Sequence, residues 1–112
     1  MHFRHLCAVI AGLILAGCVA LRTADNLRHT HISPDVQLPK VELEHVVREV
    51  TRRTLNPIVC ITRIAAEYPD GITVYTDVEH EPWRFGVYDL RKDTDGKWHS
   101  SFRGVSSIIA CP

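Results

Sequence analysis

An apolar run near the N-terminus limits how much of this chain can enter a folded domain. From Leu6 to Leu21 the sequence contains no charged residue, and a short basic start with Arg4 precedes it. The run is shorter than the roughly 18–20 apolar residues that span a bilayer core. A basic start, a short apolar stretch and then small residues form the layout of an export signal, which is removed from the mature protein. We therefore expect residues 1–17 to be a signal peptide and the fold to come from the remainder.

The apolar run ends in the sequence Leu15-Ala16-Gly17-Cys18. This order of an aliphatic residue, two small residues and a cysteine resembles the lipobox of bacterial lipoproteins. The resemblance covers only the N-terminal segment. It implies cleavage before Cys18 and acylation of that cysteine, with chains such as palmitate. Two or three acyl chains hold a protein stably on a membrane. The alternative is that Cys18 is a small apolar residue in a signal anchor.

The residue after the cysteine and the overall charge bear on location and partners. Val19 stands where an aspartate would retain a Gram-negative lipoprotein at the inner membrane, so the resemblance favours the periplasmic face of the outer membrane. The formal net charge is +0, with 13 basic and 13 acidic residues. No cationic excess is available to attract a phosphate backbone, so no nucleic acid partner is expected. We expect membrane attachment through the lipid and an unidentified envelope protein as partner.

Two segments with different patterns follow the cysteine. Residues 18–40 are polar, contain Pro34 and Pro39, and lack apolar periodicity, so we expect a lipidated N-terminus and an irregular tether. From Val41 to Leu55 the apolar residues recur at helical spacing, at Leu43, Val46, Val47 and Val50. The polar side mixes charges, which favours a helix that covers a core over one that lies on a membrane. Arg48 and Arg52 should then be exposed.

The rest of the chain alternates apolar and polar residues, as β-strands do. Strands are expected over Ile58–Tyr68, Ile72–Val78, Trp83–Val87 and Lys97–Arg103, with turns at Pro69–Gly71 and Asp93–Gly96 and a bulge at Gly104. We expect residues 41–112 to form an α+β domain in which one amphipathic helix packs on a four-stranded antiparallel meander. That arrangement resembles cystatin-like and NTF2-like modules in outline. Trp83 and Trp98 are expected in its core.

Cys60 and Cys111 are the cysteines that remain after cleavage and lipidation. A small exported domain is marginally stable without a crosslink, and exported compartments permit disulfides. A bridge would stabilise the domain by roughly 4 kcal/mol on the chain-entropy model. The outer strands of a four-stranded sheet lie about 14 Å apart, so the segment after Gly104 must fold back. We expect this bridge; two buried free thiols are the alternative.

Three polar motifs suggest chemistry, and each has a simpler interpretation. His29-Thr30-His31 offers two histidines, too few for a tetrahedral metal site. Asp93-Thr94-Asp95-Gly96 resembles the start of a calcium loop but lacks the closing glutamate, so a hairpin turn is expected. Glu79-His80-Glu81 precedes a proline and fits a polar loop better than an acid–base site. No metal, cofactor or catalytic residue is expected.

Neither a nucleophile elbow nor a glycine-rich phosphate loop is present in the sequence. We therefore expect a membrane-anchored module of the cell envelope that acts by binding, as a scaffold or an inhibitor, rather than by catalysis. Its contact residues could be Tyr75, Trp83, Tyr88 and Trp98, if they are exposed. The alternative is a small envelope enzyme or ligand-binding domain with a pocket between helix and sheet.

Overall fold

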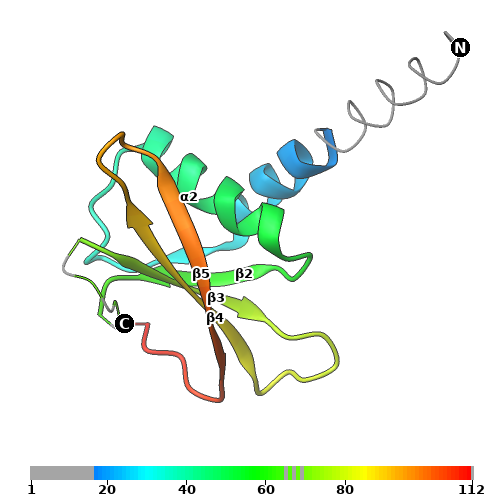
Figure 1. The fold of residues 1–112 in the computed structure, drawn as a ribbon. Coiled ribbons are helices and arrows are strands. Elements are labelled where there is room, and N and C mark those ends of the chain that lie inside the picture. Colours follow the sequence, from blue (N-terminus) through cyan, green and yellow to red (C-terminus); the bar gives the residue numbers. More distant parts are fainter. Residues whose placement is uncertain (1–16, 65, 67, 69, 112) are drawn as a thin grey trace, which may run out of the picture.

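The computed structural model describes residues 17–64, 66, 68 and 70–111. In this part of the chain, two helices lie on one face of a five-stranded sheet (Figure 1). The described part of the first helix covers residues 17–29, and the other elements are β1 (His31–Ile32), α2 (Lys40–Arg53), β2 (Ile58–Thr62), β3 (Ile72–Asp77), β4 (Phe85–Lys92) and β5 (Trp98–Ser106). The expected α+β class is confirmed.

α2 forms where the apolar spacing predicts it. Val46, Val47 and Val50 are 0% exposed, whereas Arg48 and Arg52 face solvent. The helix ends at Arg53 because Thr54 adopts an extended conformation, and its N–H donates to the carbonyl of Val50 at 3.1 Å. The predicted orientation of the helix is therefore confirmed, and the observed bounds are Lys40–Arg53 rather than Val41–Leu55.

Strands β2 to β5 form the predicted antiparallel meander. The predicted turn at Asp93–Gly96 is present, with Gly96 at a φ of 81°. The predicted irregularity at Gly104 is also present: Val87 pairs with Gly104 and Tyr88 with Phe102, which leaves Arg103 as the extra residue of a β-bulge. The prediction of four strands is wrong, because β1 adds a fifth strand that pairs in parallel with β2 and makes the sheet mixed.

The expected irregular tether is also wrong, because residues 18–40 belong largely to the fold. Asn26 is 7% exposed; its Nδ2 donates to Thr51 Oγ1 at 3.1 Å, and its Oδ1 accepts from the N–H of Ile58 at 3.0 Å. The first helix is thereby joined to both α2 and β2. Val36 is part of the core. Leu27, Ile32 and Leu38 also pack against the core, but they do not recur at helical spacing, so the sequence shows no apolar stripe in this segment.

Most of the expected signal peptide, residues 1–16, lies outside the described residues. Among the described residues, no helix has both the length and the apolar character needed to cross a membrane. Ala65, Glu67 and Pro69 also fall outside them. The strand predicted over Ile58–Tyr68 is too long, because β2 ends at Thr62.

Each face of the sheet has its own core. On the α2 face, the helix valines pack with Ile61, Val74 and Leu90. On the opposite face, a smaller cluster of Cys60, Tyr75 and Val87 is covered by residues 109–111 of the C-terminal tail. The tail therefore closes the face that no helix covers.

Candidate functional site

Cys18 lies in the first described turn of the N-terminal helix. Its thiol is exposed and free. One helical turn later, Arg22 Nη2 donates to the carbonyl of Thr54, at the end of α2. The first contact between the N-terminal helix and the rest of the domain therefore lies one helical turn after the proposed lipid attachment site.

Cys60 and Cys111 are joined by a disulfide, as predicted. Their Cα atoms are 6.7 Å apart, because the chain after β5 folds back across the sheet, as that geometry required. Cys60 is 2% exposed, so the bridge is shielded from solvent at that end. Cys18 is left as the free cysteine of the described part of the chain.

The four aromatic residues considered as contacts divide into buried and exposed groups. Tyr75 and Trp98 are buried, at 4% and 8% exposure, and Tyr88 is half-buried. The Trp98 indole N–H donates to Glu42 Oε2 at 2.7 Å; this bond, followed by the contact with Lys92, lowers the pKa of Glu42. Trp83 is 64% exposed, so its expected place in the core is wrong. It lies in the turn before β4, which begins only at Phe85.

An apolar surface on the β4–β5 hairpin extends beyond α2. It consists of Tyr88, Phe102 and Val105, and we call it the hairpin surface; Phe102 and Val105 are 57% and 45% exposed. Phe102 lies on the α2 face of the sheet, because Ser100, two residues earlier, binds Glu49 of α2. The Tyr88 and Phe102 rings are in tilted contact, with centroids 5.2 Å apart.

Gly86 lies beneath the two rings of the hairpin surface. A Cβ atom at this position would lie 2.6 Å from Thr76 Oγ1 and 3.7 Å from a carbon of each ring. The absence of a side chain therefore leaves room for both rings. Phe102 is nevertheless exposed, although Trp98 and Ser100, which precede it on the same face of β5, are 8% and 7% exposed. No pattern in the sequence distinguishes Phe102 from these two residues.

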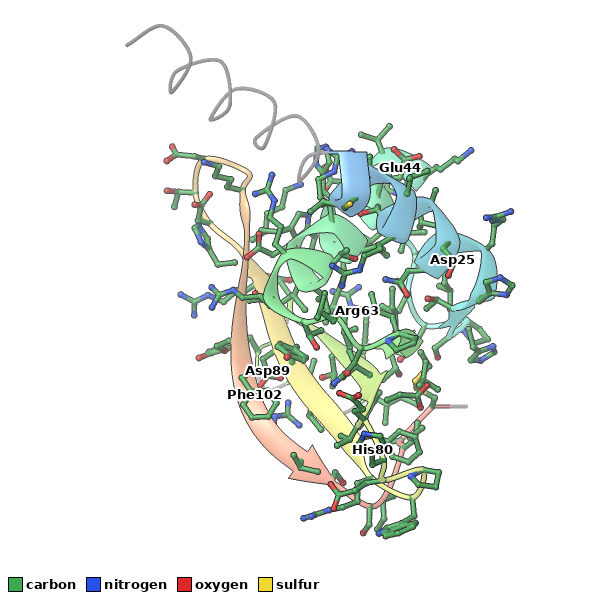
Figure 2. The ribbon with its side chains drawn as sticks, turned by 90° about the vertical axis from the view of Figure 1, so that its right-hand side faces the viewer. Asp25, Glu44, Arg63, His80, Asp89 and Phe102 are labelled. Atoms are coloured by element: carbon green, nitrogen blue, oxygen red, sulfur yellow. A yellow bond between two sulfur atoms is a disulfide. The ribbon has the colours of Figure 1, made fainter. Side chains whose placement is uncertain are left out.

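The hairpin surface borders an open sheet edge. Within the described residues β5 pairs with β4 alone, so its outer backbone groups face away from the sheet. An edge strand of this kind can accept an added strand from another chain. Figure 2 shows Phe102, together with His80 of the β3–β4 loop, in the half of the molecule remote from the first turn of the N-terminal helix.

A groove of about 270 Å³ lies between α2 and the β4–β5 turn. Its charged lining includes Arg48, Arg52 and Lys97 against Glu49 and Asp95. Glu49 is engaged by Arg53 Nε at 3.8 Å as well as by Ser100. The groove is open to solvent on the outer side of α2, while the space between α2 and the sheet is filled by valine side chains.

The remaining polar motifs have structural partners. Asp93 Oδ1 accepts from the backbone N–H groups of Lys97 at 2.8 Å and Asp95 at 2.9 Å, and His99 Nε2 lies 2.6 Å from Oδ2. These contacts, that from Lys97 first, lower the pKa of Asp93. Glu79-His80-Glu81 forms a polar turn, as predicted. Among the described residues, no three or more potential ligands come together to hold a metal ion.

A partly buried ion pair, which the sequence analysis did not predict, lies on the sheet face opposite α2. Asp89 is 5% exposed and accepts from both Nε, at 2.8 Å, and Nη2 of Arg103. The two nitrogens bind the two carboxylate oxygens, which is the bidentate arrangement that makes arginine–carboxylate pairs strong. Because Arg103 is the bulged residue of β5, this pair orients the bulge rather than forming a reactive centre.

Comparison with known proteins finds no matching family model, no matching curated protein and no matching solved structure.

Proposed function

We propose that this protein is a bacterial envelope lipoprotein, anchored through Cys18, whose domain binds a partner protein through the hairpin surface. The location that fits best is the periplasmic face of the outer membrane of a Gram-negative cell. We propose neither a catalytic activity nor a cofactor for this domain.

The cysteine pattern supports the anchor. The Cys60–Cys111 disulfide fits an exported protein, since such bonds persist in oxidising compartments. Cys18, which completes the lipobox-like sequence, is exposed and free. A lipidated cysteine has to be accessible in this way, because its acyl chains must enter the membrane.

The observation that carries the binding proposal is the exposure of an aromatic pair beside an open edge strand. Phe102 is held in contact with Tyr88, with Val105 beside them, and 57% of Phe102 remains accessible to a partner. Burying the exposed part of the ring would contribute on the order of 1–2 kcal/mol to binding. Pre-positioned aromatic residues of this kind are enriched among the residues that dominate interface energies.

The anchor is tested by labelling cells with a fatty-acid probe. Wild type and Cys7→Ser should incorporate the label, and Cys18→Ser should not and should accumulate as precursor. Cys7 is the matched control because it also lies in the N-terminal apolar run but lacks the small residues before it. Equal labelling of Cys18→Ser and wild type would overturn the anchor.

The binding surface is tested by photo-crosslinking in intact cells. A photoreactive residue at position 105 should give a discrete protein adduct, and Phe102→Asp should abolish it. Ile64 is 62% exposed and follows β2, two strands away from β4, so the matched control Ile64→Asp should leave the adduct unchanged. An adduct that persists in Phe102→Asp would show that this surface is not the binding site.

A further inference from the structure

We propose that the end of the domain next to Cys18 is itself a membrane-contact surface. In this arrangement two exposed leucines enter the interfacial region of the bilayer, and nearby arginines meet anionic phospholipid headgroups. We call this region the anchor-end surface; it consists of Leu21, Leu55, Arg22, Arg52 and Arg53. The inference rests on the proposed lipidation of Cys18.

The connection between the lipid and the domain is short and rigid. Cys18 and Arg22 are one helical turn apart, about 6 Å along the axis. Arg22 is bound to the carbonyl of Thr54, and Asn26, a further turn on, is bound to both Thr51 and Ile58. The lipid therefore cannot act as the end of a flexible tether. It holds one particular side of the domain at the bilayer.

Two leucines on that side of the domain are largely exposed to solvent. Leu21 is 74% exposed and Leu55 is 82% exposed. Leu21 is three residues from Cys18 in the same helix, and Leu55 shares a small hollow with Arg22 and Pro57. Figure 1 shows the start of the N-terminal helix and the C-terminal end of α2 on the same side of the molecule. Insertion into the membrane interface would remove these two leucine side chains from water, which is energetically favourable.

The charges around these leucines favour an anionic lipid surface. Arg22, Arg52 and Arg53 lie at or near the 54–57 loop. Arg53 pairs with Glu49 at 3.8 Å and Arg28 pairs with Asp25 at 3.7 Å, so four arginines face two acids and the region keeps a cationic excess. Basic residues close to a membrane are attracted to anionic headgroups. Arginine donates to phosphate oxygens through two parallel N–H groups.

The test uses the lipidated mature protein in vesicles of phosphatidylglycerol and phosphatidylcholine. A bimane label is placed on Leu55→Cys or, as the control, on Glu79→Cys in the distal β3–β4 loop. With Cys18 acylated and Cys60 bonded to Cys111, the introduced thiol is the one available for labelling. Nitroxide lipids should quench the label at position 55 at least about twofold more than the label at position 79. Equal quenching at the two positions would overturn the inference.

Two further arms separate the possible causes of a negative result. If the protein fails to float with vesicles, the lipid anchor itself is wrong; if it floats but the label at position 55 is not quenched, only the contact surface is wrong. Arg52→Glu combined with Arg53→Glu should reduce quenching at position 55 in phosphatidylglycerol vesicles to the level found in pure phosphatidylcholine. If wild-type quenching is the same in both lipids, the role of the arginines is overturned.

Discussion

Replacing Asn26 with alanine tests whether the N-terminal helix is an integral part of the domain. The side chain is buried, and it satisfies the N–H of Ile58 while donating to Thr51 Oγ1. This one side chain therefore joins the first helix to both α2 and β2. In Asn26→Ala, the N–H of Ile58, a residue that is 3% exposed, loses its acceptor.

The expected cost follows from these contacts. A buried N–H left without an acceptor costs about 1–3 kcal/mol, and the lost bond to Thr51 adds about 1 kcal/mol. Thr51 keeps its own hydrogen bond to the carbonyl of Val47 at 2.7 Å, so its hydroxyl is not left without a partner in the mutant. Alanine has a better helix propensity than asparagine, which returns about 0.5 kcal/mol. We expect a net loss of about 2 kcal/mol, equivalent to roughly 8–16 °C in melting temperature for a domain of this size.

The assay is a reversible thermal or urea melt of the chain from residue 18 onward, made unlipidated with Cys18→Ser in every sample. Asp25→Ala is the matched control, because Asp25 is the neighbouring helical residue and is largely exposed, and its change should stay below about 0.5 kcal/mol. If Asn26→Ala melts like Asp25→Ala, the helix is a detachable tether, and the rigid connection between Cys18 and the domain is refuted.

Three further predictions concern the core, the crosslink and an acidic turn. Val47→Asp places a carboxylate where the side chain is 0% exposed and should unfold the domain, whereas Arg52→Asp should shift stability by less than about 1 kcal/mol; melts that rank them in reverse would contradict the packing of α2. Cys60 and Cys111 should resist alkylation until a reductant is added, and mass spectrometry of two alkylated thiols without reductant would rule out the bridge. Hydrogen bonds from backbone N–H groups lower the pKa of Asp93, so its stabilising effect is complete above the unfolded pKa near 3.8 and is lost as pH falls through the lower folded value. The melting difference between wild type and Asp93→Asn should therefore shrink below about pH 4, and a difference that grows there would contradict this account.

Local pattern was sufficient for the elements whose apolar residues face the main core. The spacing of Val46, Val47 and Val50 predicted the buried face of α2, and the turn at Asp93–Gly96 followed from its residue types. The disulfide could be predicted because only one pair of cysteines remained and the tail was long enough to return. The helix face and the turn each depend on residues close together in the sequence, and the disulfide follows from the number of cysteines that remain.

The elements that sequence analysis missed depend on contacts between distant residues. The helix over residues 17–29 is attached by Asn26, whose partners Thr51 and Ile58 lie on other elements, and no local apolar pattern signals such an attachment. β1 has only two residues and exists because it pairs with β2. The hairpin surface was missed because alternation places Phe102 on a face of the sheet without saying how far the covering helix reaches.

The central claim is that Cys18 is the lipidated first residue of the mature protein. Intact mass spectrometry of protein extracted from cell membranes tests it most directly. We expect a chain that begins at Cys18, carries the mass of a diacylglyceryl group with or without a further acyl chain, and is two hydrogens lighter than its dithiol form. A chain that retains residues 1–17, or that begins at residue 18 without added lipid mass, would contradict it.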